Sequence, residues 1–323
     1  MRAAFTGLRP PPRPATGRRS VRGHKLDSLL MDFLLPARKV KHAAFVARKR
    51  VRRGYVRARD LAFTAYSAMV PFTFDVDRHR SAWGELPRMY FLHRDPPPGC
   101  STDRPVQRKI FVLWTGENDL TPNRAKGLQS IDDRNPGSVV LVTPKNLDDY
   151  IVPGKPLHSA YRHLSLVHRA DYLRAYLMHH HGGGYSDIKV CRHSWVGAFE
   201  RFESDPALWI IGYPEIGSDM CGGRDPRLGH EIRRRYRSLV GFGAFICRPG
   251  TPLTAEWLRE LDRRLDYYSE ELAQHPGDAW GENPGYPILW IELGADVLNP
   301  LQLKYLDHVG QDPMLLPQLT DHR

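Results

Sequence analysis

Long apolar runs and paired cysteines are both missing from this 323-residue chain. No stretch reaches the ~18 consecutive apolar residues of a membrane-spanning helix, so we expect none. The first residues lack an apolar segment followed by a small-residue cleavage site, so we expect no secretory signal. The cysteines, which form no Cys-x-x-Cys pair, indicate neither a structural zinc site nor a disulfide framework. They are Cys100, Cys191, Cys221 and Cys247. Together these absences predict a reducing compartment, the cytoplasm.

Several catalytic signatures are also lacking. The sequence contains no Gly-x-Ser-x-Gly elbow, which argues against a serine hydrolase of that kind. It contains neither a Walker phosphate loop nor a Gly-x-Gly-x-x-Gly fingerprint. P-loop kinases and most nicotinamide enzymes are therefore excluded.

Positive charge is concentrated at the N-terminus. Residues 1–59 hold 17 Lys or Arg and two acids, a local balance of +15, so the other residues together carry −4 of the net +11. Residues 1–25 are rich in Pro and Arg and are expected to be disordered. Residues 37–58 place Val40, Ala44, Ala47, Val51 and Tyr55 at helical spacing among Arg and Lys. Such a helix suits an anionic membrane surface or a polyanion, and a solvated basic arm fits equally well.

A folded domain is predicted from residue 104 to residue 323, after a connector at 60–103. Strands at 109–114 and 138–142 flank a helix that follows Pro122 and ends before Pro136. This strand–helix–strand order predicts an α/β fold with a mixed, mostly parallel sheet of the nucleotide-binding kind. Further strands are expected at 207–212 and 239–247, and an amphipathic helix at 256–274.

The segment from 164 to 191 is expected to carry the chemistry. A helix at 164–181 ends at three consecutive glycines, and a strand at 185–191 returns. Arg174 lies about 10 Å back along the helix from its end, and Asp187 lies about 10 Å along the returning strand. Because Asp171 shares a helix face with Arg174, a tight reversal brings Asp171, Arg174, Asp187 and Lys189 together.

Such a group of charges suits a nucleoside-diphosphate sugar. Arg174 or Lys189 can neutralise a diphosphate leaving group, and the carboxylates can accept hydrogen bonds from hydroxyls. The alternative is that Asp171 and Arg174 form an ordinary ion pair on a helix surface.

This segment resembles the signature of the Asp-x-Asp sugar-binding glycosyltransferase family. The family includes initiating mannosyltransferases, capsular polysaccharide synthesis proteins and clostridial glucosylating toxins. Its pattern is an Asp and an Arg three residues apart on a helix, a Gly-Gly-x-Tyr turn, and Asp-x-Asp on a strand. The likeness covers roughly residues 108–250 and includes His168-Arg169-Ala170-Asp171-Tyr172-Leu173-Arg174 and His181-Gly182-Gly183-Gly184-Tyr185-Ser186-Asp187-Ile188-Lys189.

The resemblance implies a GT-A fold and transfer of a hexose, with retention, from a UDP- or GDP-sugar to a glycan or lipid-linked acceptor. It implies that Asp171 and Arg174 contact the donor, and that Tyr185 belongs to the substrate-binding set. Asp187 would lie near the ribose and a Mn²⁺ or Mg²⁺ ion. Trp114 matches an aromatic residue beside the nucleotide base, although a Trp at a strand end is commonly a core residue.

One position departs from the family pattern, because the second Asp of the motif is Lys189 here. A protonated lysine cannot ligate a cation and repels one. Three outcomes are open: Lys189 replaces the metal, Asp187 holds the ion with other ligands, or the chain is an inactive relative. We favour an active enzyme with weak or absent metal dependence.

Other polar groups carry weaker signals. His179, His180 and His181 are consecutive on a helix and point about 100° apart, so they do not suit one metal ion. Asp307 and His308 could close over the donor but fit a surface loop better. The turn-rich residues 282–286 could present Glu282 to an acceptor. No role follows for the loop that contains Asp219, Cys221, Gly222 and Gly223.

A rival hypothesis assigns the function to the basic arm. In it, residues 1–59 bind a membrane or a polyanion and the folded body is catalytically degenerate. No motif for a specific nucleic acid is present.

Overall fold

The structure is a computed structural model that describes residues 21–75, 90–223 and 226–320. The chain divides into two compact units, residues 1–59 and 60–323. Helix α1 (Val21–Met69) includes the expected basic helix and extends beyond it at both ends. Residues 21–25, expected to be disordered, are helical, and the rest of that segment lies outside the described residues. Among the described residues, no helix combines the length and apolarity needed to cross a bilayer.

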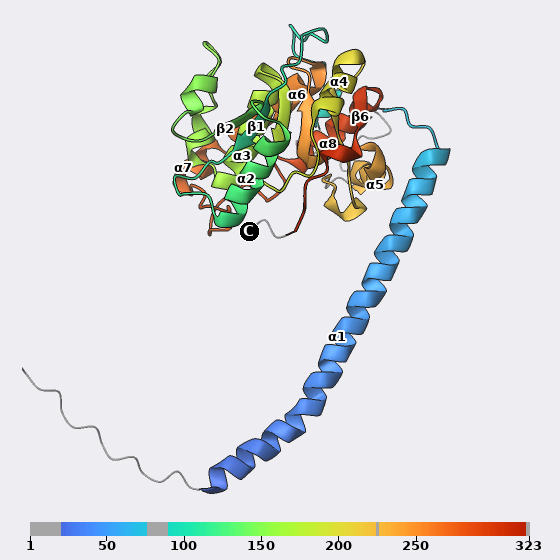
Figure 1. Cartoon of the computed structure of the whole chain (residues 1–323), viewed down its shortest axis with the longest axis vertical. Coiled ribbons are helices and arrows are strands. Elements are labelled where there is room, and N and C mark those ends of the chain that lie inside the picture. The colour runs from blue at the N-terminus through green and yellow to red at the C-terminus, as the bar shows by residue number, and fades with distance from the viewer. Residues whose placement is uncertain (1–20, 76–89, 224–225, 321–323) are drawn as a thin grey trace, which may run out of the picture. The chain divides into compact units, whose positions relative to one another are not determined.

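A six-stranded sheet forms the centre of the second unit, in the order β2-β1-β3-β5-β4-β6 (Figure 1). β1 pairs in parallel with β2 and β3, β4 pairs in parallel with β6, and β5 is antiparallel to both of its neighbours. The expected mixed, mostly parallel sheet is therefore confirmed. The strands are β1 (Ile110–Leu113), β2 (Val139–Val142), β3 (Gly183–Ser186), β4 (Ile210–Pro214), β5 (Val240–Cys247) and β6 (Val309–Gln311).

Helices cover both faces of this sheet and bury two apolar clusters. Along β1, Phe111 and Leu113 belong to one cluster, and Ile110 and Val112 to the other, because successive strand side chains point to opposite faces. The helices that pack in the first cluster are α3 (Leu166–His180), α5 (Pro226–Arg234), α6 (Pro252–Tyr267), α7 (Ser269–Gln274) and α8 (Ala295–Lys304). Those that pack in the second cluster are α2 (Pro122–Arg134) and α4 (Val196–Ser204).

Some boundaries differ from expectation. The returning strand runs over Gly183–Ser186 rather than 185–191, so Asp187 and Lys189 follow the strand instead of lying on it. Two glycines belong to it because neighbouring groups leave no room for a side chain. A Cβ at Gly183 would lie 2.8 Å from the carbonyl oxygen of Lys109, and one at Gly184 would lie 2.8 Å from the Trp195 ring.

Two further elements are shifted or divided. The expected strand at 207–212 is observed at Ile210–Pro214. The expected helix at 256–274 begins earlier, at Pro252, and is interrupted at Tyr268. The amphipathic pattern continues across the interruption, since Leu265 and Leu272 are both fully buried.

Strand direction determines where loops can meet. All strands except β5 run the same way, so their C-terminal ends share one edge of the sheet, and β5 begins at that edge. Asp187 follows β3, and Glu215 follows β4, at this C-terminal edge. Ligands of open α/β sheets commonly bind outside such an edge.

Candidate functional site

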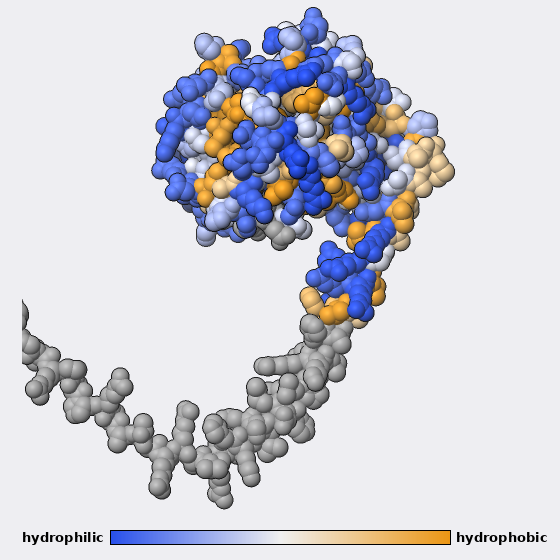
Figure 2. All heavy atoms as spheres, viewed as in Figure 1, coloured by the Kyte–Doolittle hydropathy of each residue, from blue (hydrophilic) through white to orange (hydrophobic). Residues whose placement is uncertain are grey.

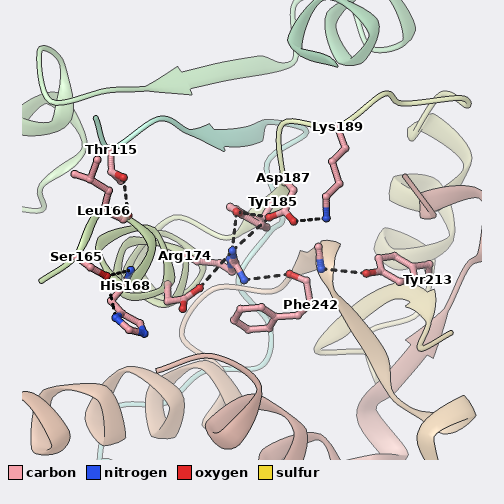
Figure 3. A network of polar contacts seen from close by, with 12 residues as sticks. Thr115, Ser165, Leu166, His168, Arg174, Tyr185, Asp187, Lys189, Tyr213 and Phe242 are labelled. Carbon is pink, nitrogen blue, oxygen red and sulfur yellow. Dashed lines mark hydrogen bonds and ion pairs between the residues drawn. The ribbon is translucent and has the colours of Figure 1, made fainter. Parts of the chain in front are cut away.

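Four charged side chains meet at the C-terminal edge of the sheet. Nη2 of Arg174 lies 3.5 Å from Oδ1 of Asp171 and 3.4 Å from Oδ1 of Asp187. Nζ of Lys189 donates to Oδ2 of Asp187 at 2.8 Å. Figure 3 shows Arg174 reaching from its helix toward Asp187, with Lys189 on the other side of that carboxylate. The expected convergence of these four residues is therefore confirmed, while their roles stay predictions.

Helix α3 places Asp171 and Arg174 because both of its ends are fixed. Ser165 caps the N-terminus by accepting from the backbone N–H of His168. The N–H groups of Leu166 and Val167 donate to the carbonyl oxygens of residues 278 and 279. These three backbone N–H groups of the first turn therefore already have acceptors within the protein. At the other end Gly182 has φ +65°, which lets the chain reverse directly into β3.

Arg174 is a buried organiser of the site. It is 5% exposed, and its guanidinium carbon lies 4.2 Å and 3.9 Å from the ring centres of Tyr185 and Phe242. Its nitrogens donate to the Tyr185 hydroxyl at 2.8 Å and to the Phe242 carbonyl oxygen at 3.2 Å. Burial opposes the charge, but the interactions with Tyr185 and the two carboxylates offset it, and the pKa of Arg174 is raised. This guanidinium positions its neighbours.

Asp187 accepts hydrogen bonds on both carboxylate oxygens. Oδ1 accepts from the Tyr185 hydroxyl at 2.8 Å as well as from Arg174, and Oδ2 accepts from Lys189. Burial by itself would raise the pKa of Asp187, but the charges of Lys189 and Arg174 outweigh it, and the pKa is lowered. Asp187 is therefore ionised at neutral pH, and a quarter of its side chain remains exposed (25%).

The pKa of Asp171 is shifted in the opposite direction from that of Asp187. Asp171 is 6% exposed, and burial raises its pKa against the lowering effect of Arg174. A Cβ at Gly294 would lie 3.5 Å from its Oδ2, so the residue before α8 packs directly on this carboxyl. The two acids of the site thus differ in the cost of ionisation.

The donor set at Asp187 does not fit a divalent cation. Mn²⁺ and Mg²⁺ prefer several oxygen ligands. Here the carboxylate already accepts from Tyr185, Arg174 and Lys189, and Lys189 supplies positive charge where a second carboxylate would supply a ligand. Within the described residues, no group of three or more His, Cys, Asp or Glu side chains is arranged to hold a metal ion.

Two residues expected to contact substrate lie at different depths. Trp114, which follows β1, is only partly buried, and its Nε1 donates to the carbonyl oxygen of Asn118 at 2.6 Å. One part of its ring system packs on the core while another faces solvent. Tyr185 is 3% exposed, and its hydroxyl accepts from Arg174 and donates to Asp187.

Sequence reasoning missed three contributors. Phe242 and Tyr213 come from β5 and β4, and the Tyr213 hydroxyl accepts from the N–H of Gly243 at 3.2 Å. The Gly243 carbonyl in turn accepts from the Asp187 N–H at 2.8 Å, which fixes the backbone of the site. Glu215 is 5% exposed, and burial raises its pKa, with the Ile216 N–H and Lys189 opposing. The sequence signal that could have pointed to Glu215 was a single acid directly after a buried apolar strand.

The weaker candidates lie elsewhere or serve the structure. His179 contacts Thr254, and His181 hydrogen-bonds to the Tyr150 carbonyl. Burial lowers the pKa of His179 and His180 to about 4. His308 stacks on Trp209 with ring centres 3.6 Å apart. Trp209 directly precedes β4, and His308 directly precedes β6. The Asp307–His308 segment therefore lies at the N-terminal edge of the sheet, opposite Asp187, and does not close over the site.

Comparisons with family models, curated proteins and solved structures found no match for this chain.

Proposed function

We propose that this chain is a glycosyltransferase that moves a hexose from a nucleoside-diphosphate sugar to a hydroxyl acceptor, using a GT-A-like form of its α/β fold. The observation that carries the proposal is the Asp171–Arg174–Asp187–Lys189 group at the C-terminal edge of the sheet. A buried arginine that holds two carboxylates beside a lysine is an arrangement suited to a ligand with both hydroxyls and a diphosphate.

Each residue then has a distinct role. Lys189 neutralises the diphosphate as the bond between the sugar C1 and the phosphate oxygen breaks. Asp187, already ionised, accepts hydroxyl hydrogen bonds on its exposed side, and Asp171 does the same for the sugar. The acceptor oxygen bonds to C1 on the face that the diphosphate leaves, and its proton passes to a leaving phosphate oxygen. Arg174 is a positioning residue, because its nitrogens already hold Tyr185, Phe242 and Asp187.

Metal independence is part of the proposal. The Lys189 ammonium lies at 2.8 Å from Asp187, where a cation bound by Asp-x-Asp would share that carboxylate. A fixed positive charge at this point stabilises developing negative charge without an added ion. We therefore expect turnover in EDTA that Mn²⁺ does not increase.

The test is a thermal-shift screen of the full chain with UDP- and GDP-sugars, followed by chromatography of the released nucleotide. A ligand that binds the folded state raises Tm. Lys189→Ala should reduce the shift and Lys126→Ala, which changes an exposed lysine on α2, should retain it. Absence of both a shift and turnover across the whole panel would refute the transferase.

We also propose that α1 contacts an anionic membrane surface. Within residues 44–59, Phe45, Val51 and Tyr55 are 63%, 73% and 67% exposed, next to a dense set of arginines. Figure 2 shows orange apolar and blue hydrophilic side chains side by side on the coloured part of this helix. Exposed apolar groups flanked by cations favour a lipid surface over a simple polyanion. This contact would suit a lipid-linked acceptor and a peripheral position on a cytoplasmic membrane face.

A further inference from the structure

Two tryptophans in the segment between α7 and α8 are exposed. Trp280 and Trp290 are 48% and 50% exposed, and their rings stack at 27° with centres 6.4 Å apart. In contrast, Trp195, Trp209 and Trp257 are at most 8% exposed. Tryptophan is the largest apolar side chain, and two exposed rings side by side form an apolar surface of the kind that binds ligands.

The loop that carries the pair is held in one conformation. Oδ1 of Asp278 accepts from the backbone N–H groups of Trp280 at 2.8 Å and Gly281 at 2.6 Å. The Tyr286 hydroxyl hydrogen-bonds to Nδ1 of His168 at 2.8 Å and accepts from the Ser165 N–H at 3.2 Å. The Tyr286 ring also stacks on His168. A surface that is already ordered loses little entropy when it binds a ligand.

This loop lies against the first turn of α3, immediately before the candidate site. The Ala279 carbonyl accepts from the Val167 N–H, and Asp171 lies one helical turn further along. The same first turn contacts the end of β1, where the Thr115 hydroxyl donates to the Leu166 carbonyl at 2.6 Å. The backbone of the Trp loop therefore lies beside the turn of α3 that leads to Asp171 and contacts Thr115, the residue after Trp114.

We propose that Trp280 and Trp290 form an acceptor subsite that stacks on a sugar ring of a neutral glycan. This inference rests on the transferase function proposed above. Apolar C–H faces of a sugar ring match flat aromatic surfaces, and its rim of hydroxyls needs polar partners nearby. Glu282, exposed and two residues after Trp280, supplies a hydrogen-bond acceptor and disfavours anionic sugars.

The test measures oligosaccharide binding to the full chain by saturation-transfer NMR, using α-1,6-mannotriose, maltotriose and cellotriose. We expect at least one to bind, and Trp280→Ala or Trp290→Ala to weaken it about tenfold. Trp280→Phe should recover most of the affinity. Tyr267→Ala is the matched control, because Tyr267 is 69% exposed at the end of α6 and lies outside the loop.

Three results would overturn the subsite: none of the three sugars binds, the alanine variants bind normally, or they alter self-association in sedimentation instead. Nucleotide-sugar thermal shifts on the same variants separate this proposal from the transferase. Normal shifts without oligosaccharide binding remove the subsite alone. Tryptophan-dependent sugar binding without any nucleotide-sugar shift or turnover removes the transferase and leaves a glycan-binding site.

Discussion

The ammonium of Lys189 lies 2.8 Å from Oδ2 of Asp187, and Oδ1 of the same carboxylate accepts from Tyr185 and Arg174. Asp187 is therefore surrounded by fixed donors on both sides. Its pKa is lowered because these charges outweigh its burial. In the proposed mechanism, Lys189 takes the electrostatic role that a metal ion has beside an Asp-x-Asp motif.

Replacing Lys189 tests that assignment. Lys189→Ala should lower kcat by about 10²–10³-fold, the typical effect of removing one preorganised charge stabiliser. Lys189→Asp restores a pair of carboxylates and should make turnover depend on Mn²⁺. Rates are measured with and without EDTA, with Lys126→Ala as the control. Unchanged turnover in Lys189→Ala would remove Lys189 from the mechanism.

Arg174 should matter for stability as well as for binding. Arg174→Met leaves Asp171 and Asp187 near one another without their shared cation, which should cost about 3–5 kcal/mol of unfolding free energy. Urea denaturation measures this. The double variant Arg174→Met/Asp171→Asn should recover part of the lost unfolding free energy, since one unpaired buried charge is removed. A cost below about 1 kcal/mol, the range of exposed pairs, would contradict the buried network.

Glu215 should make stability depend on pH. Its folded-state pKa is raised by burial, so the folded state holds a proton that the unfolded chain has released. Stability due to this group is present below the unfolded pKa of about 4.3 and is lost as pH rises through the folded value. Glu215→Gln should flatten this decline in urea titrations at several pH values. The exposed Glu117→Gln is the control, and an equal effect there would contradict the assignment.

Two glycines should respond in opposite directions to alanine. At Gly241 a Cβ would lie 2.0 Å from the Tyr213 ring, so Gly241→Ala should destabilise by about 1–3 kcal/mol. It should also weaken donor binding, because Tyr213 holds Gly243 beside Asp187. Gly197, on α4, has open space around it, and Gly197→Ala should stabilise by about 0.5 kcal/mol. Thermal unfolding of both variants provides the comparison.

The basic helix should bind anionic vesicles in a salt-sensitive manner. Changing Arg48, Arg50, Arg52 and Arg53 together to Gln should remove about 1 kcal/mol of binding free energy per charge. The matched lysine variant should bind normally, because the charge is kept. Co-sedimentation with phosphatidylserine vesicles and with neutral phosphatidylcholine vesicles measures both. Equal binding of the Gln and Lys variants would exclude an electrostatic contact.

Local pattern alone determined much of this protein. The short apolar run of β1, the Pro122 start of α2, and the glycine stop after α3 were predictable because they depend on neighbours in sequence. The meeting of Asp171, Arg174, Asp187 and Lys189 was also predictable, since one helix, one reversal and one short strand connect them. Helical rise and strand rise predicted how far these residues lie from the reversal, while the hydrogen bond from the Asp187 N–H to Gly243 on β5 fixes the backbone there.

Only the tertiary structure decided the rest. Phe242, Tyr213 and Glu215 reach the site because β5 and β4 pair beside β3, a long-range arrangement that no local spacing encodes. Likewise, Trp280 and Trp290 stack on a loop that Tyr286 and Ala279 hold against the first turn of α3. Sequence spacing fixes which groups share one element, whereas sheet order and loop packing fix which elements share one site.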